Sequence, residues 1–240
     1  MKIYNAGNIV MNTYVYQSTV GYIMIDTGYE HSLKDVEKKL VHNNINLSEI
    51  KYLFLTHAHD DHAGFLNELL SKNKELKVIL SDKAVPTLKK GQNSFNGGCS
   101  TRLAWLFCKF MELLGNGEHC FPIIEDKYDN RLIVINDDNK EEIEKILNGK
   151  ILYTPGHTLD SISLKINDIV FCGDAAMNGF PSIKRFIIWI ENTKQFEESW
   201  DLMINEGIKI IYPAHGKPFQ IKDLIKNKKD IHKINLLKLR

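Results

Sequence analysis

A short segment near residue 60 combines three histidines with a carboxylate. It consists of His57, Ala58, His59, Asp60, Asp61 and His62, a His-x-His-x-Asp-His pattern. Imidazole and carboxylate groups are ligands that zinc, iron and manganese accept, and alternate residues of an extended segment can converge on one ion. Only 9 of the 240 residues are histidine, so a cluster of this kind is rarely a chance event. The segment therefore predicts a metal site.

The residues on either side of this segment predict how it is held. Residues 50–55 are a run of branched and aromatic residues typical of a buried strand. Residues 63–70 carry apolar side chains at helical spacing. We therefore expect the histidines to occupy a strand-to-helix loop anchored by two rigid elements, and such loops often carry binding and catalysis. Asp60, between the ligands, is expected to face away from the metal or to accept a hydrogen bond from an imidazole.

Four further motifs follow one another along the chain. They are Ile25-Asp26-Thr27-Gly28, Pro155-Gly156-His157-Thr158, Gly173-Asp174 and Pro213-Ala214-His215-Gly216. With the histidine cluster they make five motifs whose order resembles the metallo-β-lactamase superfamily. The resemblance covers about residues 8–219, which is nearly the whole chain.

The resemblance implies a two-metal site. The implied ligands are His57, His59 and His157 for the first ion, Asp61, His62 and His215 for the second, and Asp174 as the bridge. Asp26 would support these ligands without binding metal. Two divalent ions are implied, with zinc first and iron or manganese as alternatives. Ions about 3.5–4 Å apart can share a bridging hydroxide, lower its pKa and polarise the bond to be cut.

The resemblance also implies a reaction class, with a small-molecule substrate. The leading hypothesis is a metal-dependent hydrolase whose binuclear metal-bound hydroxide cleaves a small ester, thioester or lactone, with Asp61 or Asp174 orienting the nucleophile. The alternatives are a phosphodiesterase or nuclease of the same fold, and a mononuclear-iron oxygenase or redox protein. Asp174 argues against zinc β-lactamase activity, because those enzymes lack the bridging carboxylate. Met177 stands where known quorum-signal lactonases have a tyrosine.

Length and composition predict one compact domain over residues 1–240. At 43% hydrophobic and 25% charged residues, the chain can bury a sizeable core. Strand-like and helix-like segments alternate, which indicates an α/β class, and the resemblance implies a four-layer αβ/βα sandwich. The expected strands are 13–17, 20–26, 50–55, 77–81, 131–135, 161–166, 168–172 and 208–212. The expected helices are 31–43, 63–72, 101–114, 193–206 and 220–236.

Two segments could surround a substrate. The insertion 82–129 contains a Gly/Asn-rich stretch followed by an apolar helix, so that a helical insertion is expected around 91–115. This helix could be a cap, a homodimer interface or an extra core helix. Residues 178–189 could add an apolar wall of Phe180, Phe186 and Trp189, with Lys184 or Arg185 binding an anionic group; otherwise the aromatic residues belong to the core and the cations face water.

The remaining features exclude other classes. The C-terminal segment from Lys217 carries eight Lys or Arg against two Asp, yet its apolar residues recur at helical spacing without aromatic residues between the cations. We therefore expect a basic C-terminal helix 220–236 and no nucleic-acid binding. The four cysteines have no Cys-x-x-Cys spacing. With no signal sequence or membrane span in the sequence, a cytoplasmic location is expected.

Overall fold

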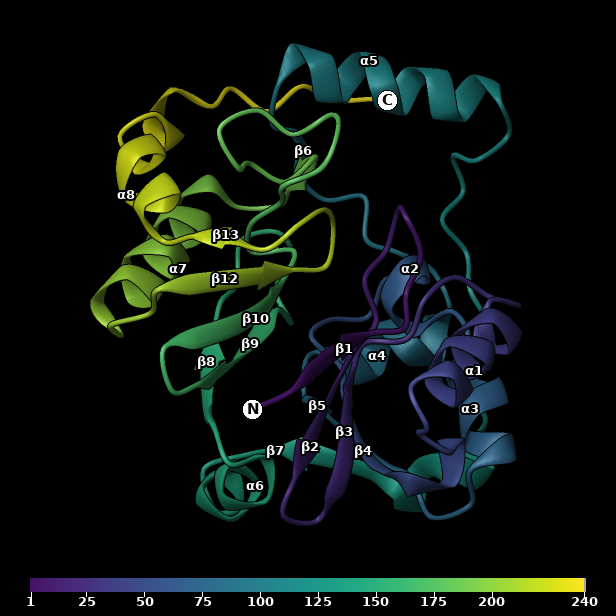
Figure 1. Cartoon of the computed structure of the whole chain (residues 1–240). Helices are drawn as coiled ribbons and strands as arrows, with labels where there is room; N and C mark the ends of the chain where they lie inside the picture. Colours follow the sequence, from purple (N-terminus) through teal and green to yellow (C-terminus); the bar gives the residue numbers. More distant parts are fainter. Residues whose placement is uncertain (240) are drawn as a thin grey trace. The chain divides into compact units, whose positions relative to one another are not determined.

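The computed structural model of the protein describes residues 1–239, and the chain divides into two compact units. Unit 1 contains Met1–Asn93 and Cys120–Lys150, whereas unit 2 contains Ser94–His119 and the chain from Ile151 onward. The elements of both units are labelled in Figure 1. That these units form one domain stays a prediction.

Unit 1 is built on a six-stranded mixed sheet with the strand order β1-β2-β3-β4-β5-β7. Its strands are β1 (Ile3–Asn5), β2 (Tyr14–Ser18), β3 (Gly21–Ile25), β4 (Ile50–Phe54), β5 (Lys77–Ser81) and β7 (Leu132–Ile135). The first three strands pair antiparallel, and β3, β4, β5 and β7 pair parallel. The carboxyl ends of parallel strands meet at one sheet edge, so Asp26 after β3 and Thr56 after β4 come together there.

Four helices of unit 1 bury apolar side chains in one core cluster. They are α1 (Leu33–His42), α2 (Asp60–Ala63), α3 (Leu66–Lys72) and α4 (Ala84–Lys90). Unit 1 also contains α6 (Lys140–Leu147) and the 3-10 helices η1 (Leu47–Glu49) and η2 (Asp126–Arg131). Leu40 of α1, Leu69 of α3 and Leu88 of α4 are buried in this cluster with Leu53 of β4 and Val78 of β5. Packing on both ends of the 55–65 segment therefore anchors the histidine cluster.

Unit 2 has a five-stranded sheet with the order β13-β12-β10-β9-β8. Its strands are β8 (Lys150–Tyr153), β9 (Ile162–Ile166), β10 (Ile169–Gly173), β12 (Ile210–Pro213) and β13 (Phe219–Gln220). Because β10 and β12 pair parallel, the residues that follow them emerge at the same edge. A separate two-stranded sheet joins β6 (Gly98–Cys99) to β11 (Trp189–Ile190). Asp174 follows β10 and His215 follows β12 in the sequence, so both lie at this edge of the sheet.

The helices of unit 2 are α5 (Arg102–Leu113), α7 (Thr193–Asn205) and α8 (Lys222–Lys228), followed by the 3-10 helix η3 (Ile231–Lys233). Phe196 and Trp200 of α7 are fully buried against Val170 of β10 and Ile211 of β12. Ala104 is the buried residue of α5, while Leu106 and Phe110 are more than half exposed. The expectation of α5 as a core helix is therefore wrong, and the cap and dimer alternatives stay predictions.

Two predicted helices differ from the structure. The helix expected over 63–72 is divided into α2 and α3, because the carbonyl of His62 accepts the backbone N–H and the hydroxyl of Thr27. The helix expected over 220–236 ends at Lys228. Beyond it Ile231 turns into the core, and Leu237 pairs with Cys99 of β6, which needs extended backbone. All eight expected strands are present with small shifts at their ends, whereas β1, β6, β8, β11, β13, α4 and α6 were not predicted.

Candidate metal centre

Four predicted ligands of unit 1 lie together directly after β4. His57, His59, Asp61 and His62 are all buried, with at most 8% of each residue exposed. His59 has extended backbone and caps α2, and Asp61 and His62 lie within that helix. The strand-to-helix loop expected for the histidine cluster is therefore extended up to His59 and helical from Asp60 onward. This change of backbone form lets four of six consecutive residues supply predicted ligands.

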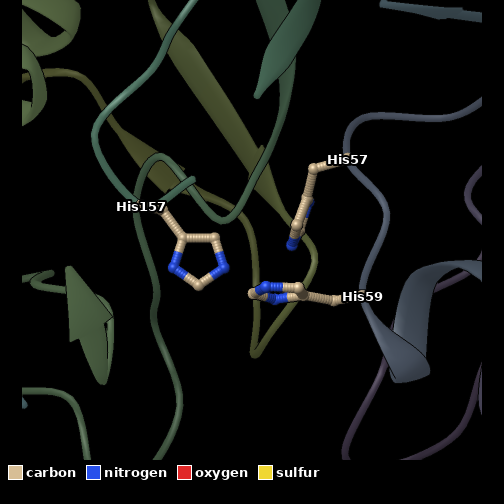
Figure 2. A group of neighbouring side chains, drawn as sticks. All are labelled: His57, His59 and His157. Carbon is tan, nitrogen blue, oxygen red and sulfur yellow. The ribbon is translucent and has the colours of Figure 1, made fainter. Parts of the chain in front are cut away.

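The side chains of this group converge. The ring centroids of His57 lie 3.9 Å from His62 and 4.6 Å from His59. Nε2 of His62 lies 3.7 Å from Oδ1 of Asp61. Figure 2 draws His57 and His59 on the segment after β4, together with His157 of unit 2. Four buried donors packed this tightly are the type of ligand set that a transition metal requires.

Asp26 orients one of these histidines. Its Oδ2 lies 2.9 Å from Nδ1 of His62 and accepts the Thr56 hydroxyl at 2.8 Å, while its Oδ1 accepts the Thr56 backbone N–H at 2.7 Å. Since a carboxylate only accepts, Nδ1 of His62 carries the proton and its Nε2 offers the lone pair. Asp26 is 1% exposed, so the arrangement is held in the interior. This position agrees with the supporting role that the sequence resemblance implies.

Three predicted ligands of unit 2 form a second group. His157 follows β8, Asp174 follows β10 and His215 follows β12, and all three are buried. Oδ1 of Asp174 lies 3.4 Å from Nε2 of His215, and its Oδ2 lies 3.5 Å from Nε2 of His157. These separations exceed the 2.7–2.9 Å or so of a charge-assisted hydrogen bond. Asp174 thus lies between the two histidines, with one carboxylate oxygen near each, without a close hydrogen bond to either.

A backbone carbonyl sets the orientation of His157. Nδ1 of His157 lies 2.7 Å from the carbonyl oxygen of Trp189 in β11. A carbonyl can only accept, so this nitrogen donates and Nε2 is left with the lone pair that faces Asp174. The backbone N–H of Glu191 also donates to the carbonyls of Gly156 and His157. This support was not predicted, because a main-chain acceptor has no residue type that would signal it.

The donor chemistry of both groups fits divalent metal. Neutral imidazoles whose second nitrogen is held by an acceptor are the usual form of metal-binding histidine. Two carboxylates, Asp61 and Asp174, offset part of the charge that two divalent ions would bring. Burial of these groups would be costly without a positive partner. The residues therefore suit the ions that the sequence analysis implied.

Lys184 and Arg185, which were expected to bind an anionic group of the substrate, contact carboxylates of the chain instead. Nζ of Lys184 lies 2.8 Å from Asp230, and the guanidinium of Arg185 lies 2.7 Å from Asp223. Phe186 belongs to the core against Trp200, whereas Phe180 is exposed and has an edge contact with Phe107. Both cations are therefore engaged by carboxylates of the C-terminal segment.

No helix within residues 1–239 has the length and apolar character needed to cross a membrane.

Comparison with known proteins connects this geometry to one family. A family model described as the metallo-beta-lactamase superfamily matches residues 7–215. The protein "Metallo-beta-lactamase fold-containing protein ST1585" of Sulfurisphaera tokodaii is 28% identical over 81% of this chain and 68% of its own length. "Beta-lactamase-like protein 2 homolog" of Caenorhabditis elegans is 26% identical over 85% of the chain and 55% of its own length. The chain thus spans about half the length of this second relative.

Solved structures show the same fold at lower identity. The metallo-beta-lactamase family protein TTHA1429 of Thermus thermophilus superimposes with a TM-score of 0.66 at 15% identity, covering 96% of this chain and 78% of that one. A metallo-beta-lactamase of Cronobacter sakazakii gives a TM-score of 0.64 at 17% identity over 96% of this chain and 88% of that one. The expected α/β sandwich class is thereby confirmed as a matter of fold.

Proposed function

The chain belongs to the metallo-β-lactamase superfamily, and from this premise we propose that it is a hydrolase of a small ester, thioester or lactone. The observation that carries the proposal is the buried set of seven donors with the residue types of a binuclear hydrolase. An intact donor set argues against a non-catalytic binding protein, because loss of ligands is the simplest route to lost activity. The substrate and the metal are the parts that need experiment.

We propose that the two ligand groups form one centre. Three sets of donors in the chain suit an ion, and each combines side chains from both units: His57 and His59 with His157, His57 and His62 with Asp174, and Asp61 and His62 with His215. These sets support the assignment of Asp174 as the shared ligand and of two divalent ions, with zinc first. Such ions, when bound, would lower the pKa of water and polarise the bond to be cut.

The chain's own residues supply the rest of the chemistry. Asp26 and the Trp189 carbonyl keep His62 and His157 in the tautomer that presents Nε2. The carboxylate of Asp61 or Asp174 would orient the attacking water by accepting a hydrogen bond from it. Because both are buried, they act in a region of low dielectric constant, where such orientation is most effective.

A carbonyl substrate is favoured over a phosphodiester. The two cations expected to bind an anionic substrate, Lys184 and Arg185, are paired with Asp230 and Asp223. Phosphodiester hydrolysis is the alternative that these two cations would favour by binding the phosphate, and their pairing removes that support. Neutral carbonyl substrates do not call for such cations, so esters, thioesters and lactones stay the first candidates.

Metal analysis and a substrate screen together test this proposal. The zinc-loaded protein should hydrolyse at least one of p-nitrophenyl esters, acyl thioesters or lactones faster than bis-p-nitrophenyl phosphate. The D174A and H157A variants should lose activity by a factor of about 10³ or more and bind less metal. D168A is the matched control, because Asp168 lies at the surface and pairs with Lys209. Full turnover by metal-free D174A would overturn the proposal, and one bound iron with no hydrolysis would favour an oxygenase.

A further inference from the structure

The chain crosses from unit 1 to unit 2 between Asn93 and Ser94. On the unit 1 side of this crossing, a residue bonds to the segment that carries proposed metal ligands. On the unit 2 side, residues bond to the segment whose carbonyl orients the proposed ligand His157. We call residues 93–100 the connector. It lies in the Gly/Asn-rich stretch of the insertion, to which the proposed function assigns no role.

On the side of unit 1, Asn93 holds the histidine cluster. Its Oδ1 accepts the backbone N–H of Asp60 at 2.9 Å, and its Nδ2 donates to Oδ1 of Asp60 at 2.6 Å. Asn93 is 7% exposed, so water competes little for these bonds. Asp60 stands between His59 and Asp61 in the chain. The two bonds therefore fix the backbone where α2 begins and where two proposed ligands diverge.

On the side of unit 2, the connector holds the segment that orients His157. The indole N–H of Trp189 donates to the carbonyl of Asn96 at 2.5 Å, and Trp189 pairs with Cys99 in the two-stranded sheet. Ser100 adds a backbone bond to the Ile188 carbonyl at 2.9 Å and a hydroxyl bond to the Ile187 carbonyl at 2.5 Å. The carbonyl of Trp189 is the acceptor for Nδ1 of His157. The bonds from Asn96, Cys99 and Ser100 therefore fix the position of the Trp189 carbonyl.

We propose that the connector positions metal ligands of both units, with Asn93 and Trp189 as the positioning residues. The inference rests on the proposed metal centre, because it concerns how ligands of that centre are aimed. Asn93 and Asn96 are three residues apart, a reach of at most about 11 Å at roughly 3.6 Å per residue. The two anchors are thereby tied together by one short stretch of chain. Partners that orient ligands in this way typically change metal affinity 10–100-fold when removed.

The first experiment is a reciprocal exchange at the unit 1 anchor, read out as zinc affinity by competition with a chromophoric chelator. N93D places two carboxylates against each other and should weaken zinc binding about tenfold or more. The double variant D60N/N93D restores one amide and one carboxylate and should bind within a few-fold of the unaltered protein. The absorption spectrum of the cobalt-substituted protein should change in N93D and return in the double variant. Loss of fold alone would not produce this rescue.

The second experiment removes the anchor in unit 2. W189F lacks the indole N–H and should weaken zinc binding by about tenfold, with a changed cobalt spectrum. W105F is the matched control, since Trp105 lies on α5 and its indole N–H donates to the carbonyl of Lys238 in the C-terminal segment. N96A is a second control, because the connection uses the backbone carbonyl of Asn96 and leaves its exposed side chain aside. Both controls should bind zinc like the unaltered protein.

The outcomes separate the inference from the proposed function. Failure of the unaltered protein to bind zinc, cobalt, iron or manganese overturns the metal centre itself. Normal metal binding in the unaltered protein together with unchanged affinity in N93D and W189F overturns the connector role alone. Thermal unfolding of the metal-free variants shows whether each is folded, and N93A replaces N93D if the latter is not. Equal weakening in W105F would also count against the inference.

Discussion

At the scale of single residues, the proposed site depends on acceptors that select one tautomer of two histidines, His62 and His157. Asp26 receives three hydrogen bonds from Thr56 and His62, and Trp189 offers His157 a carbonyl. A histidine with the opposite tautomer would present an N–H to a metal ion and could not bind it. The acceptors are therefore as necessary to the ligand set as the ligands themselves.

The D26N substitution tests this dependence. An amide has one acceptor oxygen, so it cannot serve both the Thr56 backbone and Nδ1 of His62 as the carboxylate does. We expect zinc affinity to fall about 10–100-fold, measured by competition with a chelator. The positive φ of Asp26 is tolerated by asparagine, so backbone strain should not account for the change. D35N on the surface of α1 is the control, and equal affinity in D26N would refute the tautomer argument.

At the scale of elements, the side chain of Arg131 holds the end of α3 and the turn that leads into β5. Arg131, at the end of η2, donates to the carbonyls of Leu70 in α3 and of Leu76 before β5. It also donates to the carbonyl of Asn73, which follows α3. The last carbonyls of a helix lack partners within it. One guanidinium thus closes α3 and fixes the turn into β5.

The R131K substitution should therefore cost more than its chemical similarity suggests. A lysine ammonium cannot span carbonyls that a planar guanidinium reaches together, so some of them lose their donor. We expect the free energy of unfolding to fall by about 1–3 kcal/mol. Urea denaturation measures it, with an unchanged m-value if the native and unfolded states are otherwise alike. R102K, at the exposed start of α5, should stay within about 0.5 kcal/mol of the unaltered protein.

The elements also show which information a single sequence carries. The β4 strand and the cluster after it were predictable, because both are contiguous patterns of residue type. Asp174 and His215 required comparison with a family, since a lone Gly-Asp or Ala-His-Gly is too short to be specific. The end of α8 at Lys228 and the division at Gly64 depend on partners distant in sequence, Cys99 and Thr27. Asn93 and the Trp189 carbonyl were missed for the same reason.

At the scale of the whole molecule, the seven proposed ligands are divided between the two units. Unit 1 supplies His57, His59, Asp61 and His62, and unit 2 supplies His157, Asp174 and His215. An ion bound by ligands of both units would stabilise only the folded state in which both sets of ligands contact the ion. Metal binding should then act as a link between the units as well as a source of chemistry.

This link predicts how chelation affects unfolding. At a zinc concentration about 1,000 times its dissociation constant, binding adds about 4 kcal/mol to the free energy of unfolding, so chelation should lower the melting temperature of the unaltered protein. The increment should shrink in H59A of unit 1 and equally in H215A of unit 2, while H42A, which removes an exposed histidine, keeps it. Calorimetry with and without chelator measures all four. If H215A retained the full increment, unit 1 would bind zinc by itself, and a shared centre would be wrong. If H59A and H215A both lose the zinc-dependent increment in the free energy of unfolding, ligands of the two units act together in binding zinc.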